Sequence, residues 1–334
     1  MEKLLIKGGN QLSGKITCSG AKNAALPMIA STILSNEKVT LKNLPYLQDI
    51  TTMFELLGSM GADILLDEDM NFTIQSNNLK DIEARYELVK TMRASILVLG
   101  PLIAKYGKAR IALPGGCAIG SRPVNYHLDS LKQMGAEIAL KNGYIEASAK
   151  NLKGADIRFD GITVTGTENL MMAATLAEGT TTLLNVAREP EIIDLANFLN
   201  ILGANIKGAG TDEIIIEGVD ELSGGRFSIP FDRIEAGTYL AAAVATKGNI
   251  RINKIDSSRM GNMIEKFQLM GAFVELNANS IHIKMEKNIK PVDVITEPFP
   301  GFPTDMQAQF TLINSVANGS ATVTEKIFEN RFMH

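Results

Sequence analysis

The sequence lacks tryptophan altogether, and it is poor in the residues that metal sites and disulfide frameworks need. Its 334 residues include two cysteines and three histidines, and aromatic residues make up only 6% of the chain. Two cysteines are too few for a disulfide framework or a cysteine-rich zinc site, and His127, His282 and His334 do not show the spacing of metal ligands. We therefore expect neither a disulfide-stapled fold nor a metal centre.

An excess of charge of one sign is also absent. The chain carries 33 basic and 37 acidic residues, a balance that disfavours nucleic acid or an anionic membrane surface as a partner. The longest apolar stretch, at 94–104, is shorter than the roughly 18 residues that a membrane span requires. The first ten residues lack the apolar core of a signal peptide. We expect a cytoplasmic globular protein that acts on small molecules.

A strand-like phrase recurs about every 70 residues, which indicates an internal repeat. Its copies occupy 38–43, 109–114, 180–185, 249–254 and 320–325. A second phrase recurs at the same interval, at 57–66, 131–140, 200–209 and 269–278. Each copy predicts an apolar helix that ends at a glycine and is followed directly by a strand. Alternating segments come next and are typical of second hairpin strands: NFTIQS, GYIEAS, EIIIEG and SIHIKM.

Three helical segments in these repeats are rich in alanine and apolar on most of their surface: AALPMIASTIL, MMAATLAEG and AGTYLAAAVAT. A helix that lacks a polar face is buried, so we expect these helices to lie inside, with the sheets packed around them. The sequence therefore predicts an α/β (α+β) fold, an inside-out α/β barrel of βαβαββ units of about 70 residues each. Four full units and the first half of a fifth are present, and a closed array normally needs its last unit.

A charged residue stands at each junction where a strand runs into an inner helix. These residues are Lys22, Arg93, Glu168, Arg233 and Asp305. Because equivalent positions of a repeat point the same way, we expect all of them at helix N-termini, where N–H groups and the helix dipole attract anions. The alternative is that they are N-caps and surface ion pairs. The first interpretation suits a ligand that carries phosphates or carboxylates.

The loop LPGGCAIGSRPV at 113–124 places Cys117 after two glycines and five residues before Arg122. Glycines let the backbone approach a ligand, and a nearby guanidinium favours the thiolate over the thiol. We therefore expect Cys117 to be reactive and Cys18 to be a structural, small apolar residue. A Cys117–His127 pair of a cysteine hydrolase is a weaker alternative, because their separation around a proline carries no specific signal.

The turn FPTD at 302–305 holds Asp305 near two prolines, Pro300 and Pro303, so this hinge is expected to be stiff. A fixed carboxylate that faces a basic cleft is a candidate general base. A role as N-cap of a helix that starts near Met306 is compatible with it.

Six motifs stand out along the chain: SGAKNAALP at 19–27, LPGGCAIGSRPV at 113–124, TGTENLMMAATLAEGTT at 165–181, AREPEIIDLANFL at 187–199, PGFPTDMQAQF at 300–310 and IFENRFMH at 327–334. In order and spacing they resemble the UDP-N-acetylglucosamine 1-carboxyvinyltransferase family of enolpyruvyl transferases. The resemblance implies two inside-out lobes, the first made of residues 1–21 and 230–334 and the second of residues 22–229. The GGCAIG loop separates this family from the 5-enolpyruvylshikimate-3-phosphate synthases, which share the fold and lack that loop.

The resemblance also implies a role for each matching residue. Lys22 and Asn23 match residues that hold phosphoenolpyruvate, with Lys22 neutralising its phosphate, and Arg93 matches a ligand-binding arginine beside them. Cys117 matches a general acid toward the methylene carbon, which can form a covalent adduct and is alkylated by fosfomycin. Asp305 matches the base that takes the proton from the sugar 3′-hydroxyl.

Other matching residues are expected to line the cleft for the nucleotide sugar. They are Arg122, Pro123, Val124, Asn125, Tyr126, Thr163, Val164, Ile327 and Arg331. Gly161 departs from the family pattern, because some members carry a lysine there that contributes to diphosphate binding.

The implied reaction is an addition followed by an elimination, and it belongs to peptidoglycan synthesis. It moves the enolpyruvyl group of phosphoenolpyruvate to the 3′-hydroxyl of UDP-N-acetylglucosamine, releases phosphate, and needs no metal or organic cofactor. The alternatives are an enolpyruvyl transferase with another acceptor and an inactive scaffold that binds a UDP-sugar. The family continues for about one further repeat. We therefore expect this chain to be a fragment, or a second chain to supply the missing unit.

Overall fold

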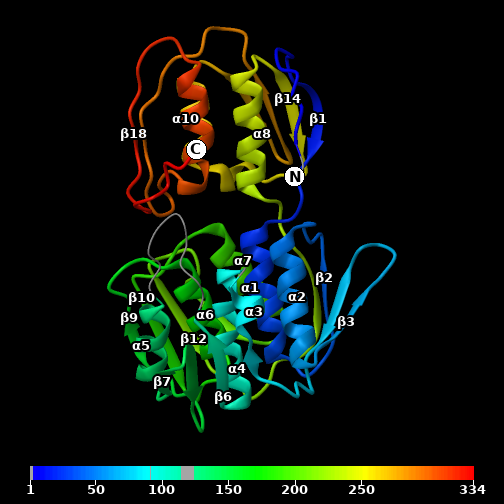
Figure 1. The fold of residues 1–334 in the computed structure, drawn as a ribbon, viewed down its shortest axis with the longest axis vertical. Coiled ribbons are helices and arrows are strands. Elements are labelled where there is room, and N and C mark those ends of the chain that lie inside the picture. Colours follow the sequence, from blue (N-terminus) through cyan, green and yellow to red (C-terminus); the bar gives the residue numbers. More distant parts are fainter. Residues whose placement is uncertain (1–2, 91, 114–123) are drawn as a thin grey trace. The chain divides into compact units, whose positions relative to one another are not determined.

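The computed structural model describes residues 3–90, 92–113 and 124–334. The chain forms two compact units: the continuous unit, Gly20–Pro230, and the split unit, which combines Met1–Ser19 with Phe231–His334. The chain therefore passes from one unit to the other twice, at residues 19–20 and 230–231. Figure 1 shows the helices and strands of both units with the labels used below.

The described part of the continuous unit contains three four-stranded sheets that share one strand order. In each sheet the first two strands are parallel and the remaining pairs are antiparallel. In that order the strands are β13 (Gly225–Ser228), β2 (Val39–Lys42), β4 (Phe72–Gln75) and β3 (Asp63–Leu66); β5 (Glu83–Ala84), β6 (Lys108–Ala112), β8 (Tyr144–Ser148) and β7 (Glu137–Lys141); and β9 (Asp156–Arg158), β10 (Thr180–Leu184), β12 (Glu213–Glu217) and β11 (Asn205–Lys207). The predicted repeat is thus confirmed.

Inner helices of the continuous unit pack against one another, as their alanine-rich, apolar sequences predict. They are α1 (Lys22–Ser31) with η1 (Thr32–Leu34), η2 (Arg93–Val98) with α4 (Leu99–Tyr106), and α6 (Val164–Ala174). Residues 24–31 of α1 and 166–174 of α6 are all buried. The other helices of this unit are α2 (Gln48–Met60), α3 (Tyr86–Val89), α5 (Asn125–Gln133) and α7 (Pro190–Ile201).

The split unit has one sheet of the same order and one shorter sheet among its described residues. The first is β1 (Ser13–Thr17), β14 (Asn249–Asn253), β16 (Ser280–Lys284) and β15 (Phe273–Asn277); the second is the parallel pair β17 (Val294–Ile295) and β18 (Val323–Thr324). The helical segments are α8 (Arg233–Ala245), η3 (Ser257–Met260), α9 (Asn262–Leu269), η4 (Thr304–Met306) and α10 (Gln307–Ser315). Helices α8 and α10 pack together over a core that includes Phe267, Phe302 and Phe310.

The predicted helix stops at glycine are confirmed in both units. After each of four helices the chain turns at a glycine with positive φ and enters a strand, at Gly61, Gly135, Gly203 and Gly271. Glycine adopts this conformation without the steric cost of a Cβ atom, so the same residue ends the helix and starts the hairpin. With inner helices and outer sheets in βαβαββ order, the predicted inside-out α/β fold class is confirmed (Figure 1). No described helix is long and apolar enough to cross a membrane.

Candidate active site

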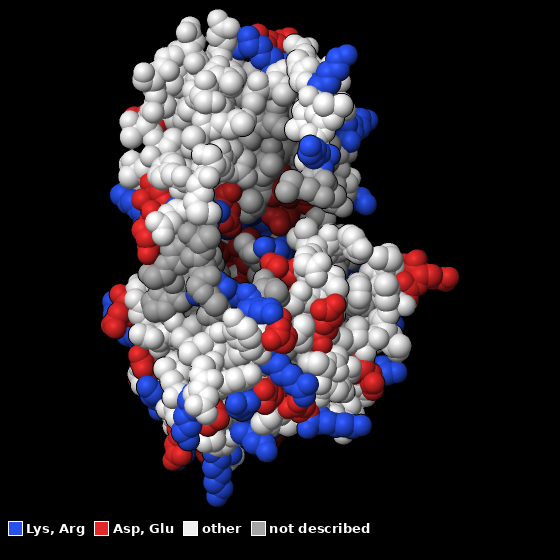
Figure 2. Space-filling model, in the orientation of Figure 1, with Lys and Arg blue, Asp and Glu red and all other residues white. Residues whose placement is uncertain are grey.

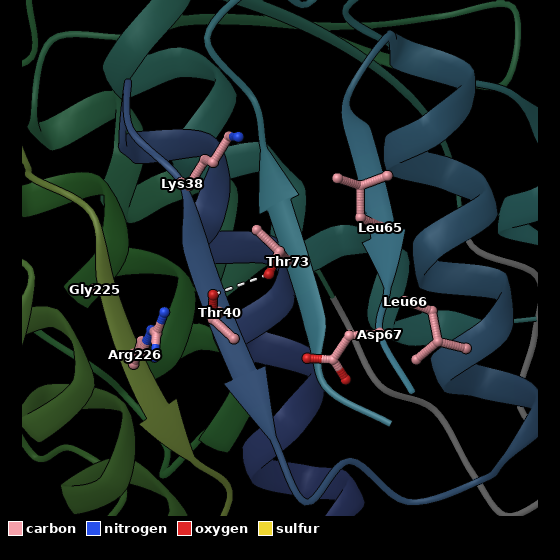
Figure 3. Close-up of a pocket in the computed structure, with 8 residues that line it drawn as sticks. All are labelled: Lys38, Thr40, Leu65, Leu66, Asp67, Thr73, Gly225 and Arg226. Atoms are coloured by element: carbon pink, nitrogen blue, oxygen red, sulfur yellow. Dashed lines mark hydrogen bonds between the residues drawn. The ribbon is translucent and has the colours of Figure 1, made fainter. Parts of the chain in front are cut away.

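Two hollows lie on the solvent-facing sides of sheets in the continuous unit, and neither is lined by a predicted site residue. One, of about 700 Å³, is lined by Lys38, Thr40, Asp67 and Arg226, among others (Figure 3). The other lies on the β5–β8 sheet in the next repeat. Because the two hollows occupy matching places in two repeats, we infer that they result from the shape of the repeated sheet. On the face shown in Figure 2, Lys and Arg of this unit are interspersed with Asp and Glu.

The predicted phosphoenolpyruvate residues lie at the starts of inner helices. Lys22 and Asn23 are the first two residues of α1, and Arg93 is the first residue of η2, which packs against α1. Lys22 Nζ lies 3.2 Å from Asp49 Oδ2, in an ion pair whose side chains are both more than one third exposed. Ala21 is the N-cap residue of α1 and makes no side-chain hydrogen bond to the helix. The N–H groups of the first turn and the Lys22 cation together form an arrangement that attracts an anion.

Five of the predicted nucleotide residues lie at the starts of α5 and α6, which contact each other: Val124, Asn125, Tyr126, Thr163 and Val164. Val124 is the N-cap of α5, and Asn125 and Tyr126 form its first turn. Thr163 is the N-cap of α6, and its hydroxyl accepts a hydrogen bond from Gly166 N at 3.2 Å. Cys117, Arg122 and Pro123, which the sequence places in this site, lie outside the described residues.

Gly161 and Tyr126 are fitted to each other. A Cβ atom on Gly161 would lie 2.8 Å from the Tyr126 hydroxyl oxygen, which is closer than van der Waals contact allows. A side chain at this position would therefore require the Tyr126 hydroxyl to move.

His127 and Asn169 form a buried network that the sequence analysis missed. Asn169 Oδ1 accepts from Gly100 N at 2.6 Å, and its Nδ2 donates to Ile96 O at 2.9 Å. The same Nδ2 lies 2.9 Å from His127 Nδ1, so Nδ1 accepts and the ring proton is on Nε2, 3.3 Å from Thr165 Oγ1. Burial lowers the pKa of His127 to about 4, so the ring is neutral near pH 7. His127 is a structural tie between α5 and α6.

The expected position of Glu168 at a helix N-terminus is wrong. Because the Thr163 hydroxyl caps α6, the helix begins at Val164, and Glu168 lies more than a turn inside it with only 2% of its surface exposed. Burial, then the neighbouring Glu191 and Glu189, raise its pKa well above the usual range. Glu168 is therefore a buried carboxyl group whose surroundings favour its neutral form, and it does not stand at the helix start.

Asp305 lies in η4 of the split unit, and its side chain does not cap a helix. Pro303 is the N-cap of η4 and Met306 that of α10, and neither cap has a side-chain hydrogen bond. Asp305 Oδ1 instead accepts from Arg331 Nη2 at 2.8 Å. Two predicted site residues are thus in direct contact, and the arginine fixes one carboxylate oxygen of the candidate base. Ile327 lies four residues before Arg331 in the same segment.

Arg233 is the last of the charged residues predicted at the strand–helix junctions, and it is the first residue of α8. Asp232 caps this helix by accepting hydrogen bonds from Ile234 N and Glu235 N. The predicted placement of Lys22, Arg93 and Arg233 at helix starts agrees with the structure. Among the described residues, no group of three His, Cys, Asp or Glu side chains is arranged to bind a metal ion.

A family model described as EPSP synthase (3-phosphoshikimate 1-carboxyvinyltransferase) matches residues 6–334. The UDP-N-acetylglucosamine 1-carboxyvinyltransferase of Coxiella burnetii (strain Dugway 5J108-111) is 56% identical over 336 residues, which cover 100% of this chain and 77% of that protein. The enzyme of the same name from Hydrogenovibrio crunogenus is 53% identical over 335 residues, which cover 100% of this chain and 80% of that protein.

Solved structures show the same fold. The enolpyruvyl transferase NikO from Streptomyces tendae superposes with a TM-score of 0.85 at 24% identity, over 98% of this chain and 78% of that one. The EPSP synthase from Acinetobacter baumannii superposes with a TM-score of 0.72 at 19% identity, over 95% of this chain and 74% of that one. Together with the sequence matches, these findings identify the chain as a member of the EPSP synthase family and, within it, of the UDP-N-acetylglucosamine 1-carboxyvinyltransferases.

Proposed function

We propose that this chain transfers the enolpyruvyl group of phosphoenolpyruvate to the 3′-hydroxyl of UDP-N-acetylglucosamine and releases phosphate. The reaction would take place in the cytoplasm, as a step of peptidoglycan synthesis. The observation that carries this proposal is the 56% identity to a UDP-N-acetylglucosamine 1-carboxyvinyltransferase over the whole chain. The contact between Asp305 and Arg331 supports it, because these two residues come from two separate motifs of the resemblance.

The proposed chemistry needs one base and one acid. The sugar hydroxyl attacks C2 of phosphoenolpyruvate and loses its proton to Asp305, while C3 gains a proton from Cys117. The product is a tetrahedral ketal that still carries the phosphate. In the second step C3 loses a proton, the C2–C3 double bond re-forms and phosphate leaves. Arg331 holds Oδ1 of Asp305, so Oδ2 is left to accept the proton.

Cations and helix N-termini are proposed to bind the charged parts of both substrates. Lys22 at the start of α1 and Arg93 at the start of η2 would neutralise the phosphate and carboxylate of phosphoenolpyruvate. Arg122, Pro123 and the first turns of α5 and α6 would line the nucleotide. Such contacts stabilise negative charge as it moves to the leaving phosphate, and their loss commonly lowers turnover by about 10²-fold or more.

The proposal is tested by phosphate release in a steady-state assay with purified protein. We expect release that requires both phosphoenolpyruvate and UDP-N-acetylglucosamine, and none when shikimate 3-phosphate replaces the nucleotide sugar. Asp305→Asn should lower kcat by about 10²- to 10⁴-fold, because it removes the proton acceptor without changing the shape of the side chain. Turnover with shikimate 3-phosphate, or phosphate release without an acceptor, would refute the proposed substrate.

A further inference from the structure

One carboxylate, Glu325, gathers hydrogen bonds from three separate stretches of the split unit. Its Oε1 accepts from Thr296 Oγ1 at 2.8 Å, from Ile327 N at 2.7 Å and from Phe328 N at 3.0 Å. Its Oε2 accepts from Thr304 Oγ1 at 2.8 Å. Hydrogen bonds to an ionised acceptor are about twice as strong as those between neutral groups, so this carboxylate ties the three stretches firmly.

The residues tied by Glu325 are neighbours of the candidate site. Thr304 directly precedes Asp305 in η4, and Ile327 is a predicted contact to the nucleotide sugar. Arg331, from the same C-terminal segment as Glu325, donates to Asp305 Oδ1 at 2.8 Å. Consecutive residues of η4 are thus each held by one residue of the segment 325–331.

Among the described residues, packing fixes only the last residue of this turn, Met306. The η4 segment is only three residues long, and its N-cap Pro303 makes no side-chain hydrogen bond. Of its residues only Met306 is buried, and Asp305 is 40% exposed. Met306 anchors one end of the turn in the core, whereas Thr304 and Asp305 are only partly buried and depend more on polar contacts for their position. Glu325 supplies the polar contact that reaches Thr304, the first residue of the turn.

We propose that Glu325 is a positioning residue for the proposed general base: it holds Thr304, and through it Asp305, in the orientation that receives the proton of the sugar hydroxyl. The proposal rests on the function proposed above. Glu325 touches neither substrate in this account. Its removal should therefore change the geometry of proton transfer more than the binding of phosphoenolpyruvate, whose proposed residues lie in the continuous unit.

Three variants separate the contacts of Glu325. Glu325→Ala removes all of them, and we expect kcat to fall by about 10- to 100-fold, since a displacement of about 1 Å at a reacting group has that effect. Glu325→Gln should retain kcat within about threefold, because its amide oxygen accepts from the same N–H groups and its NH₂ donates to the Thr304 hydroxyl. Thr304→Val keeps Glu325 bound to Thr296, Ile327 and Phe328, and should lower kcat by about tenfold. In all three variants the KM for phosphoenolpyruvate should change less than about twofold.

Asp293→Ala is the matched control. Asp293 Oδ1 accepts from Thr322 N at 2.7 Å, so this carboxylate also ties the β17 region to the segment before β18 but has no hydrogen bond to η4. We expect Asp293→Ala to lower the thermal midpoint without changing kcat per folded molecule. A wild-type kcat in Glu325→Ala, or an equal loss of kcat in Asp293→Ala, would overturn the proposal. If Glu325→Ala does not fold, Thr304→Val decides, and wild-type kcat in that variant overturns it.

Hydrogen exchange gives a readout that does not depend on turnover. Amides of residues 304–307 should exchange faster in Glu325→Ala and Thr304→Val than in the wild type, and at the wild-type rate in Asp293→Ala. Unchanged exchange at η4 in the first two variants would contradict the positioning role. If the wild type releases no phosphate with its two substrates, the proposed function fails, and the exchange measurement still decides whether Glu325 holds η4.

Discussion

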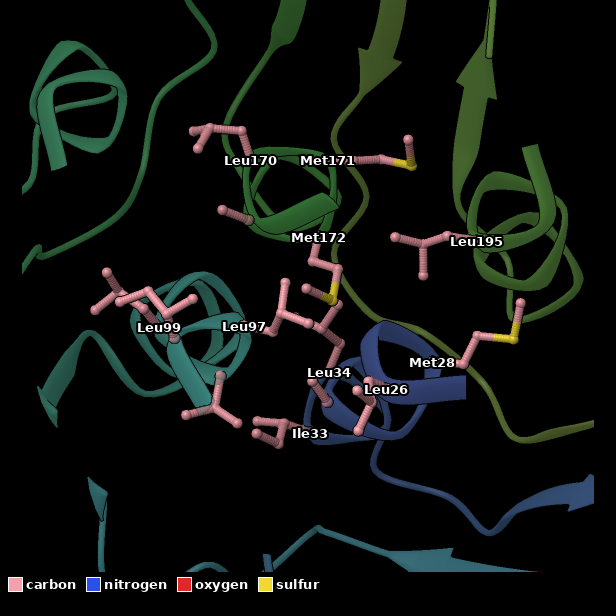
Figure 4. Close-up of a cluster of buried hydrophobic side chains, with 14 of the residues drawn as sticks. Leu26, Met28, Ile33, Leu34, Leu97, Leu99, Leu170, Met171, Met172 and Leu195 are labelled. Atoms are coloured by element: carbon pink, nitrogen blue, oxygen red, sulfur yellow. The ribbon is translucent and has the colours of Figure 1, made fainter. Parts of the chain in front are cut away.

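In the continuous unit Lys22, Asn23 and Thr163 stand at the starts of α1 and α6, whose later turns are completely buried, whereas in the split unit Asp305 lies in a three-residue turn. Figure 4 shows Leu34, Leu97 and Met172 meeting among the inner helices of the continuous unit. In the split unit, only Gln307, Phe310 and Ile313 of α10 are buried, and Leu312 is 56% exposed. The repeat therefore positions its polar site residues in two ways: on buried helices in the continuous unit and on a partly exposed turn in the split unit.

The difference teaches that packing and polar contacts replace each other as means of positioning. Where the helix behind a site residue is buried on all sides, the helix start cannot move without disturbing the core. Where it is half exposed, a charged group takes over, as Glu325 and Arg331 do around η4. Asn169 is the neutral counterpart in the continuous unit, where its buried amide ties α6 to η2, α4 and α5.

The largest expected contrast comes from leucine truncation in the two inner helices. Leu170→Ala in α6 removes a side chain with 0% exposure, and we expect a loss of about 3 kcal/mol in the free energy of unfolding. Leu312→Ala in α10 removes a side chain that is 56% exposed, and the loss should stay within about 0.5 kcal/mol. Urea denaturation followed by far-UV circular dichroism, with hydrogen exchange to assign each unit, measures both. Equal losses would show that the two helices are equally supported.

A second contrast comes from replacing a glycine by alanine in each unit, at positions where other atoms lie close to the glycine. A Cβ atom on Gly100 in α4 would overlap the carbonyl and side-chain oxygens of Asn169, so Gly100→Ala should cost about 2–3 kcal/mol. On Gly237 in α8 it would lie 2.9 Å from the Met306 sulfur and 3.0 Å from the Met263 sulfur. These flexible ends can move aside, so Gly237→Ala should cost less than about 1 kcal/mol. A larger loss for Gly237→Ala would mean that the split unit is packed as rigidly as the other.

A smaller effect should appear in the pH dependence of stability. The pKa of Glu168 is raised well above its unfolded value, so at rising pH the unfolded chain releases a proton that the folded chain retains. Stability therefore falls as pH rises above the unfolded pKa of Glu168, and Glu168→Gln should remove this fall. His127 contributes the opposite pH dependence, but it does so in both proteins. The difference in free energy of unfolding between wild type and variant, measured from pH 5 to 8, therefore reports Glu168 alone. Glu221→Gln, at an exposed position of the same unit, should leave the pH dependence unchanged, and a flat difference for Glu168→Gln would contradict the assignment.

The smallest effect concerns the thiol of the split unit. Burial, then Glu235 and Asp232, raise the pKa of Cys18 to about 12, so at pH 8 only on the order of one molecule in ten thousand carries its thiolate. We expect iodoacetamide or fosfomycin to modify the peptide that contains Cys117 and to leave Cys18 unmodified until the protein is denatured. Peptide mass mapping measures both sites in one sample. Equal modification of Cys18 in the folded protein would contradict its burial.

Local signals in the sequence predicted most of the fold. The glycines at 61, 135, 203 and 271 end helices whatever surrounds them, because their backbone conformation is costly for other residues. The repeat of these stops, together with alanine-rich helices that lack a polar face, was sufficient to predict buried helices and outer sheets. The shared sheet order follows from the same repeat.

Side-chain contacts between distant segments could not be predicted in this way. Asn169 and His127 are 42 residues apart, and Glu325 and Thr304 are 21 apart, so no spacing rule connects them. Glu168 was misplaced because the Thr163 hydroxyl, rather than the charged residue, decides where α6 begins. The local signal for this helix start is the capping hydroxyl of Thr163, three residues before Gly166.

The proposed product of this chain is an enolpyruvyl ether of UDP-N-acetylglucosamine, and analysis of that product tests the proposed reaction most directly. The protein would be incubated with phosphoenolpyruvate and UDP-N-acetylglucosamine, and the nucleotide fraction examined by mass spectrometry and proton NMR. We predict a nucleotide sugar heavier by one enolpyruvyl group, with two vinyl protons and the new ether at the 3′ oxygen, and none of it with Asp305→Asn over the same time. An unchanged nucleotide sugar, or an ether at another hydroxyl, would contradict the account.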